Sequence, residues 1–163
     1  MGIFDRSEVL LGAEALKKLN NSTVAVFGIG GVGSYTVEAL VRGGIGELYL
    51  YDADTVSESN INRQLVATTK TIGLAKVDVA AEHAFEVNPE IKIHKEQLFF
   101  NAETAESIDF TKFDYVVDAI DTVSSKLLLI EKAKAEHVSR VGSEPFVSPI
   151  PKDVKPQAIG MKK

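Results

Sequence analysis

A glycine-rich run from Gly28 to Ser34 constrains this chain more than any other feature of its sequence. It follows an apolar stretch of β type at residues 23–27 and precedes a stretch with helical spacing at residues 35–41. Glycine permits a sharp turn and a close approach of the main chain to a ligand, and a helix N-terminus offers free N–H groups with partial positive charge. The run therefore predicts a strand–turn–helix unit that binds the phosphates of a nucleotide.

The composition is typical of an ordinary soluble globular protein. The chain has 163 residues, 45% hydrophobic and 25% charged, with a formal net charge of −5 and no basic block. Bulk electrostatic attraction to nucleic acid is therefore not indicated, although the composition is compatible with a local basic groove. The absence of cysteine excludes disulfides, cysteine–zinc sites and thiol nucleophiles. No apolar run approaches the ~20 residues of a membrane span, and the N-terminus lacks a signal-peptide core. We therefore expect a cytoplasmic protein with no membrane partner.

Segments of strand and helix character alternate along the first 135 residues. Strands are expected at 23–27, 48–51, 91–94 and 114–120, and helices at 7–19, 35–41, 61–67, 74–87 and 127–135. This alternation predicts an α/β, Rossmann-like fold, in which a mostly parallel sheet carries helices on both faces. Four of the five prolines lie after residue 140, which predicts an irregular, proline-rich tail over residues 137–163.

The glycine run also fits a dinucleotide-binding pattern. Gly28, Gly30 and Gly33 satisfy G-x-G-x-x-G, and Asp52 ends the next expected strand. An acidic residue at that place accepts hydrogen bonds from ribose hydroxyls. These features fit NAD, FAD and ATP alike. Arg63 and Lys76 follow in and after a polar segment, and they favour a triphosphate, whose larger charge needs cations and a metal.

Two further carboxylates lie at the end of an expected strand. Asp118 and Asp121 fall at the edge where open α/β sheets bind their ligands. A carboxylate there can hold Mg²⁺, which prefers oxygen ligands. Asp121 can instead cap the helix that follows it. Likewise, Lys76 alone can be read as a solvated helix lysine, and neither it nor Arg63 is expected to belong to the core.

Together these motifs resemble the ThiF/MoeB/HesA adenylylating family, the bacterial relatives of ubiquitin-activating enzymes. The resemblance covers roughly residues 4–135 and is carried by the glycine run, Asp52-x-Asp54, the segment SNINRQ at 59–64, Lys76 and Asp118-x-x-Asp121. It implies binding of Mg-ATP and attachment of AMP to a carboxylate, with loss of pyrophosphate. It is strongest to members that activate the threonylcarbamoyl group of a tRNA adenosine, which implies tRNA as substrate and cyclisation of that base.

The resemblance also implies roles for individual residues. Arg63, Lys76 and Arg6 would be catalytic, Arg6 from the other subunit of a homodimer, and Asp121 would hold Mg²⁺. A sulfur-transfer protein is a further implied partner. The residues implied to bind the nucleotide are Gly28, Gly30, Gly31, Gly33, Ser34, Asp52, Asp54, Asn60, Arg63, Gln64 and Lys76.

The chain departs from the family in two respects. Without cysteine, neither a thioester route nor a four-cysteine zinc site can form, which favours direct cyclisation. The resemblance also fades after residue 135, so we expect a shortened C-terminal part: an ATP-binding adenylylating domain over residues 1–136, and a tail over 137–163 that is the remnant of the family's C-terminal region after a missing internal segment.

Two other functions stay open. One is a non-catalytic nucleotide-binding or dimerisation module, which the shortened C-terminal part favours. The other is an NAD-dependent oxidoreductase, against which the lack of a suitable acid or base for hydride transfer after Asp121 counts.

Overall fold

The computed structural model describes residues 2–142, which form one parallel five-stranded sheet in the order β3-β2-β1-β4-β5. The strands are β1 at Thr23–Phe27, β2 at Glu47–Tyr51, β3 at Lys92–Glu96, β4 at Tyr115–Asp118 and β5 at Ser139–Gly142. Strand β1 is central, because β2 pairs with one of its edges and β4 with the other. Since every pairing is parallel, the carboxyl ends of the strands meet along one edge of the sheet.

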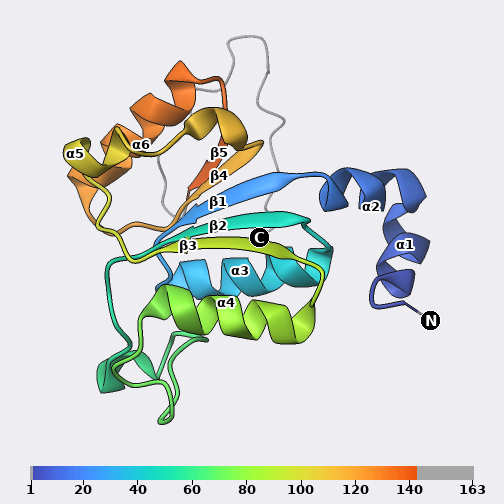
Figure 1. Cartoon of the computed structure of the whole chain (residues 1–163), viewed down its shortest axis with the longest axis horizontal. Coiled ribbons are helices and arrows are strands. Elements are labelled where there is room, and N and C mark those ends of the chain that lie inside the picture. The colour runs from blue at the N-terminus through green and yellow to red at the C-terminus, as the bar shows by residue number, and fades with distance from the viewer. Residues whose placement is uncertain (1, 143–163) are drawn as a thin grey trace, which may run out of the picture.

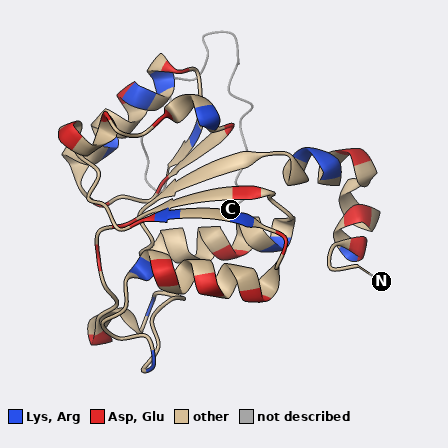
Figure 2. Ribbon diagram, viewed as in Figure 1, with Lys and Arg blue, Asp and Glu red and all other residues tan. Residues whose placement is uncertain are grey.

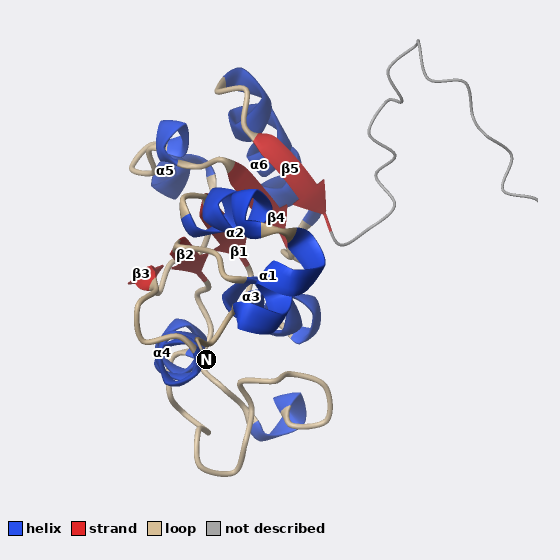
Figure 3. Ribbon diagram, turned by 90° about the vertical axis from the view of Figure 1, so that its right-hand side faces the viewer, coloured by secondary structure: helices blue, strands red, loops and turns tan. Residues whose placement is uncertain are grey.

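Helices cover both faces of this sheet (Figures 1 and 3). One face carries α3 at Gly31–Gly43 and α4 at Lys76–Val87, and the other carries α5 at Ala102–Ala105, a 3₁₀ helix at Phe110–Lys112 and α6 at Val123–Ala135. Side chains alternate along β1, so that Val26 enters an aliphatic core beside α3 and α4, and Phe27 an aromatic core with Phe100 and Phe110 on the opposite face. The predicted α/β, Rossmann-like fold is confirmed.

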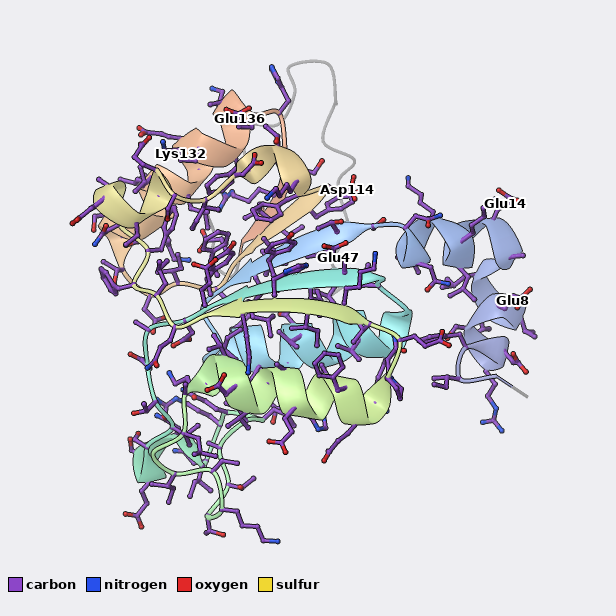
Figure 4. All side chains as sticks on the ribbon, viewed as in Figure 1. Glu8, Glu14, Glu47, Asp114, Lys132 and Glu136 are labelled. Atoms are coloured by element: carbon purple, nitrogen blue, oxygen red, sulfur yellow. The ribbon has the colours of Figure 1, made fainter. Side chains whose placement is uncertain are left out.

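The N-terminal segment differs from the single helix expected over residues 7–19. Two helices form, α1 at Asp5–Leu11 and α2 at Ala13–Asn20, and Gly12 between them has φ +85°. No residue of α1 is buried, and Leu10 is 86% exposed, whereas Leu16 of α2 is buried. The apolar spacing continues through the break, but the break turns α1 away from the sheet, and Glu8 and Glu14 project outward there (Figures 1 and 4).

The helix expected at residues 61–67 is wrong. That segment consists mostly of turns, and a 3₁₀ helix instead covers Glu58–Asn60. The side chain of Asn60 accepts a hydrogen bond from the Ser57 N–H at 3.0 Å within this 3₁₀ turn. Inside residues 61–67, the Leu65 N–H donates to Ser34 Oγ at 3.1 Å rather than to a carbonyl four residues earlier. Asparagine and serine side chains that bond to nearby main chain compete with helix formation.

The sheet also continues beyond residue 136, where the sequence suggested the end of the nucleotide-binding domain. Strand β5 pairs with β4 as the fifth strand. Residues 143–163 of the expected tail lie outside the described residues. From residue 2 to residue 142, no helix combines the length and the apolar character needed to cross a membrane.

Candidate functional site

A cavity of about 530 Å³ opens at the edge where the parallel strands have their carboxyl ends. The ends of β1 and β2, the turn after β4 and the starts of α3 and α4 contribute to its walls. Nine of the eleven residues expected to bind the nucleotide line it, namely Gly28, Gly30, Gly31, Asp52, Asp54, Asn60, Arg63, Gln64 and Lys76. Residues that are far apart in sequence thus meet at one place.

The glycines of the turn serve two different purposes. Gly28 has φ +93°, and a Cβ there would lie 2.5 Å from the Ala119 carbonyl oxygen. A Cβ at Gly33 would overlap the carbonyl oxygen of Gly28. A Cβ at Gly30, by contrast, would have no neighbour closer than 3.9 Å, the Nε2 of Gln64. Gly28 and Gly33 are therefore required by packing, whereas Gly30 leaves space at the cavity.

Asp52 holds the glycine turn against the end of β2. Its Oδ2 accepts a hydrogen bond from the Ile29 N–H at 2.5 Å, and its Oδ1 accepts one from the Asp54 N–H at 2.8 Å. The carboxylate is buried, with 8% of its side chain exposed. Each oxygen of a carboxylate has a second lone pair, so the position still allows the ribose contact that the sequence predicts.

Lys76 is a buried cation in the cavity wall. It is the first residue of α4, and only 6% of its side chain is exposed. Its Nζ lies 2.7 Å from Asp54 Oδ2 and 3.9 Å from Asp52 Oδ1. The interpretation of Lys76 as a solvated helix lysine is therefore wrong, as is its expected absence from the core.

The segment after β2 folds over the start of α3. Ser34 does not line the cavity. Its Oγ accepts a hydrogen bond from the Leu65 N–H at 3.1 Å, which holds the segment after β2 against the start of α3. Gln64 is buried beside the cavity, and its Oε1 has no hydrogen-bond partner among the residues that the structure describes. A buried acceptor without a partner costs about 1–3 kcal/mol. A bound donor would remove that cost.

Arg63 is an exposed cation at the cavity. Its Nη1 donates hydrogen bonds to the Ser59 carbonyl at 2.8 Å and to Asn62 Oδ1 at 3.0 Å. It makes no ion pair within residues 2–142, so its charge is not neutralised there. An arginine in this state can bind an anionic ligand.

The carboxylates of Asp118, the last residue of β4, and Asp121, three residues later, differ in their surroundings. Asp118 is buried and forms ion pairs with Lys126 and Arg140, which leaves it unsuited to a metal ion. Asp121 lines the cavity and forms no hydrogen bond or ion pair with the described residues. The interpretation of Asp121 as a helix cap is wrong, because Thr122 is the N-cap of α6.

Asp121 alone does not make a metal site. In the described part of the chain, no group of three or more His, Asp and Glu side chains is arranged to hold a metal ion. Mg²⁺ is commonly held by one or two carboxylates together with phosphate oxygens and water. The single free carboxylate fits Mg²⁺ that arrives with a phosphate ligand.

One wall of the cavity is apolar and was not predicted from the sequence. Leu98, Phe99 and Phe100 line it after β3, and Tyr51 lines it at the end of β2. Tyr51 stacks on Phe27 with ring centroids 4.6 Å apart, and burial raises the pKa of its phenol, which therefore stays protonated. Such a wall suits a planar base. The only signal in the sequence is that Tyr51 directly precedes Asp52.

Arg6 is the one expected catalytic residue that the fold does not bring to the cavity. It lies on α1, which extends beyond the amino ends of the strands, whereas the cavity lies at their carboxyl ends (Figure 1). Within one chain, Arg6 and the cavity are at opposite ends of the sheet.

The strand order, the glycine turn and the acidic residue at the end of β2 define a nucleotide-binding domain of the Rossmann type. Residues 4–146 match the model of the ThiF family, and the chain belongs to that family. This confirms the resemblance inferred from the sequence.

Several relatives carry one name. The tRNA threonylcarbamoyladenosine dehydratase of Bacillus subtilis is 41% identical over 140 residues, which are 86% of this chain and 55% of that protein. The Escherichia coli protein of the same name is 38% identical over 132 residues, which are 81% of this chain and 49% of the relative. A crystal structure of the E. coli enzyme, TcdA, in complex with ATP has a TM-score of 0.80 at 37% identity, covering 85% of this chain and 57% of that one. The chain thus spans about half the length of these relatives.

Proposed function

We propose that this protein binds Mg-ATP in the cavity and adenylylates a carboxylate, that of the threonylcarbamoyl group on a tRNA adenosine, which leads to cyclisation of the base. The observation that carries the proposal is the buried ammonium of Lys76 in the wall of a glycine-lined cavity. Fixed cations and helix N–H groups around open space are what a triphosphate requires. The names of the relatives, and the ATP complex of one of them, support the choice of nucleotide and acceptor.

ATP is a substrate of the proposed reaction. A carboxylate oxygen of the acceptor displaces pyrophosphate from the α-phosphorus, so that AMP becomes attached to the carboxylate. Arg63 and Lys76 stabilise the negative charge that develops on the phosphate oxygens. Asp121 would hold Mg²⁺, which neutralises part of the triphosphate charge when bound.

The acceptor needs only local electrostatic attraction to the protein. In the view of Figure 2, acidic and basic residues are interspersed over the helices and loops, in keeping with the net charge of −5. A tRNA bound by such a protein would depend on a few cations near the cavity rather than on a broad basic face. Arg63 is one such cation.

We also propose a homodimer in which Arg6 of one subunit enters the cavity of the other. The position of α1 far from the cavity of its own chain supports this arrangement, as does the exposure of Val9 and Leu10 on α1. The cytoplasmic location and a sulfur-transfer protein as partner belong to the same proposal and are supported by the family resemblance.

Isothermal titration tests the choice of nucleotide. The full chain is titrated with Mg-ATP and, separately, with NAD, and Mg-ATP is expected to bind. Tight binding of NAD with no response to ATP would refute the proposal and favour an NAD-dependent oxidoreductase.

Exchange of labelled pyrophosphate into ATP tests the activity itself. We expect exchange only when tRNA carrying threonylcarbamoyladenosine is present, and we expect Lys76→Ala to abolish it. Lys70→Ala is the matched control. Lys70 is an exposed lysine six residues before Lys76, and it does not line the cavity. Binding of ATP without any exchange would indicate a non-catalytic nucleotide-binding module.

A further inference from the structure

Asp118 at the end of β4 is a buried carboxylate held by three groups. Its Oδ2 accepts a hydrogen bond from Arg140 Nη1 at 2.8 Å, and its Oδ1 lies 3.1 Å from Lys126 Nζ. The Ile120 N–H also donates to Oδ1, at 3.2 Å. The two cations come from different elements, Lys126 from α6 and Arg140 from β5.

The residues after Asp118 pack directly against the glycine turn. Asp118 is paired in register with Phe27, and the Ala119 N–H donates to the Phe27 carbonyl at 2.9 Å. The Ala119 carbonyl is the group that a Cβ at Gly28 would meet at 2.5 Å. Residues 119–122 then line the cavity, and Asp121 is among them. The position of Asp118 therefore sets where this wall lies relative to the glycine turn.

Arg140 reaches Asp118 because β5 leaves room for it. Asp118 is paired in register with Gly142, and the position of a Cβ at Gly142 would be 2.9 Å from Arg140 Nη1. The guanidinium lies over Gly142, where any side chain would displace it. Its side chain is 18% exposed, so the contact with Asp118 is largely shielded from water. A shielded ion pair is screened less by salt than one on the surface.

We propose that Arg140 is a positioning residue for the nucleotide cavity, acting through Asp118 to fix residues 119–122 against the glycine turn. It does not line the cavity itself. The inference rests on the proposed function only in taking the cavity as the nucleotide site. It makes β5, which lies outside the expected domain of residues 1–136, part of the machinery of that site.

Amide hydrogen exchange measured by NMR on the full chain without nucleotide tests the proposal. In Arg140→Ala, the Ala119, Ile120 and Gly28 amides are expected to exchange about tenfold faster than in the wild type, while the amides of α4 change by less than about twofold. Lys132→Ala is the matched control. It removes the ion pair between Lys132 on α6, labelled in Figure 4, and Glu106, the residue that follows α5, and it should leave these amides unchanged.

Two further variants separate positioning from stability. Arg140→Lys keeps the charge and is expected to restore most of the protection, and Arg140→Gln, which keeps a donor, replaces Arg140→Ala if that variant does not fold. Unchanged exchange at Ala119 and Ile120 would overturn the proposal. So would faster exchange spread evenly over the whole sheet, since that reports only a loss of global stability.

Nucleotide affinity gives a second readout. If the wild type binds Mg-ATP, Arg140→Ala is expected to weaken binding about three- to tenfold, with Lys132→Ala unchanged. Equal affinities of all three proteins would count against Arg140. A wild type that binds no ATP would refute the proposed function and leave the exchange measurement, made without nucleotide, to decide on Arg140.

Discussion

At the scale of single residues, Lys76 combines a structural and a ligand-binding position. Its ammonium is buried beside Asp52 and Asp54, so removing it leaves the buried carboxylate of Asp52 without its cation. We expect Lys76→Ala to lower the free energy of unfolding by about 1–3 kcal/mol, less than for a fully buried pair because Asp54 is largely exposed. Urea unfolding of the free protein measures this loss.

Lys70→Ala again supplies the comparison, with an expected change within about 0.5 kcal/mol. If Lys76→Ala were as stable as Lys70→Ala, the ion pairs seen at Lys76 would contribute nothing measurable.

The glycines of the turn permit a sharper test, because they differ in the space around them. Gly33→Ala forces a methyl group into the Gly28 carbonyl, and we expect a loss of about 3 kcal/mol or more. Gly30→Ala meets no close atom, so the fold should remain while the new methyl group reduces affinity for ATP. Thermal unfolding and isothermal titration of both variants measure the two effects.

The opposite result, a stable Gly33→Ala and an unfolded Gly30→Ala, would contradict the assignment of Gly33 to close packing and of Gly30 to open space.

Some features of the site can be predicted from the local spacing of residues in the sequence, and others cannot. The glycine turn and Asp52 could be predicted, because a strand, a turn and the end of the next strand follow one another within a short stretch. The ion pair of Lys76 with Asp54 joins residues that are 22 apart, and the bond from the Leu65 N–H to Ser34 joins residues that are 31 apart. The ion pair of Asp118 with Arg140 depends on a fifth strand. Such contacts appear only once the chain is folded.

At the scale of elements, one polar cluster joins α3 to α4. Glu38 on α3 accepts hydrogen bonds from Arg42 Nε at 2.5 Å and contacts His83 Nε2 on α4 at 2.6 Å. Partial burial opposes ionisation of Glu38, but the contacts with Arg42 and His83 outweigh it and lower its pKa below the ordinary value of 4.5.

Because the folded state lowers this pKa, Glu38 stabilises the protein above the pKa of the unfolded chain, and this contribution is lost as the pH falls through the folded-state value. At pH 7 we expect Glu38→Gln to be less stable than the wild type by about 0.5 kcal/mol. The expected loss is small because the side chains of Glu38, Arg42 and His83 are partly exposed to water. The difference should shrink below pH 4.5. Chemical unfolding at several pH values measures it; a difference that does not vary with pH would exclude this ionisation as its source.

The elements that could be predicted share strong apolar patterns. Strands β1, β2 and β4 and helices α3, α4 and α6 bury regular sets of side chains, so their periods are visible in the sequence. Strand β5 could not be found this way, because its four residues include only one large apolar side chain, that of Val141. Strand β3 is an equally exposed edge strand, but the alternation Ile91-Lys92-Ile93 makes it visible in the sequence. The break at Gly12 could not be predicted, because the helical spacing of apolar residues continues on both sides of it. The segment at 61–67 lacks the expected helix because the Leu65 N–H bonds to Ser34, 31 residues away, and local spacing cannot show such a contact.

At the scale of the whole molecule, the proposed homodimer predicts that two inactive variants restore activity when they are mixed. Arg6→Ala and Asp121→Ala subunits should each be inactive alone, and a mixture should recover up to about a quarter of the wild-type exchange activity, since random pairing leaves one intact site in half of the dimers. Pyrophosphate exchange in subunit mixtures measures this recovery. Mixed dimers that are demonstrably formed yet inactive would place Arg6 outside the partner's site.

The central place of β1 has a consequence for how the chain is made. Among the five strands of the described sheet, β1 is synthesised first, yet its second edge is covered only by β4. The Thr23 N–H bonds to Asp114 just before β4, 91 residues later. Until then the edge of β1 that β4 will cover offers unpaired N–H and C=O groups to any other strand in reach. Contacts so distant in sequence also close slowly. The edge of β1 therefore stays unpaired while the 91 residues from Thr23 to Asp114 are synthesised, a period in which binding by a chaperone would protect it.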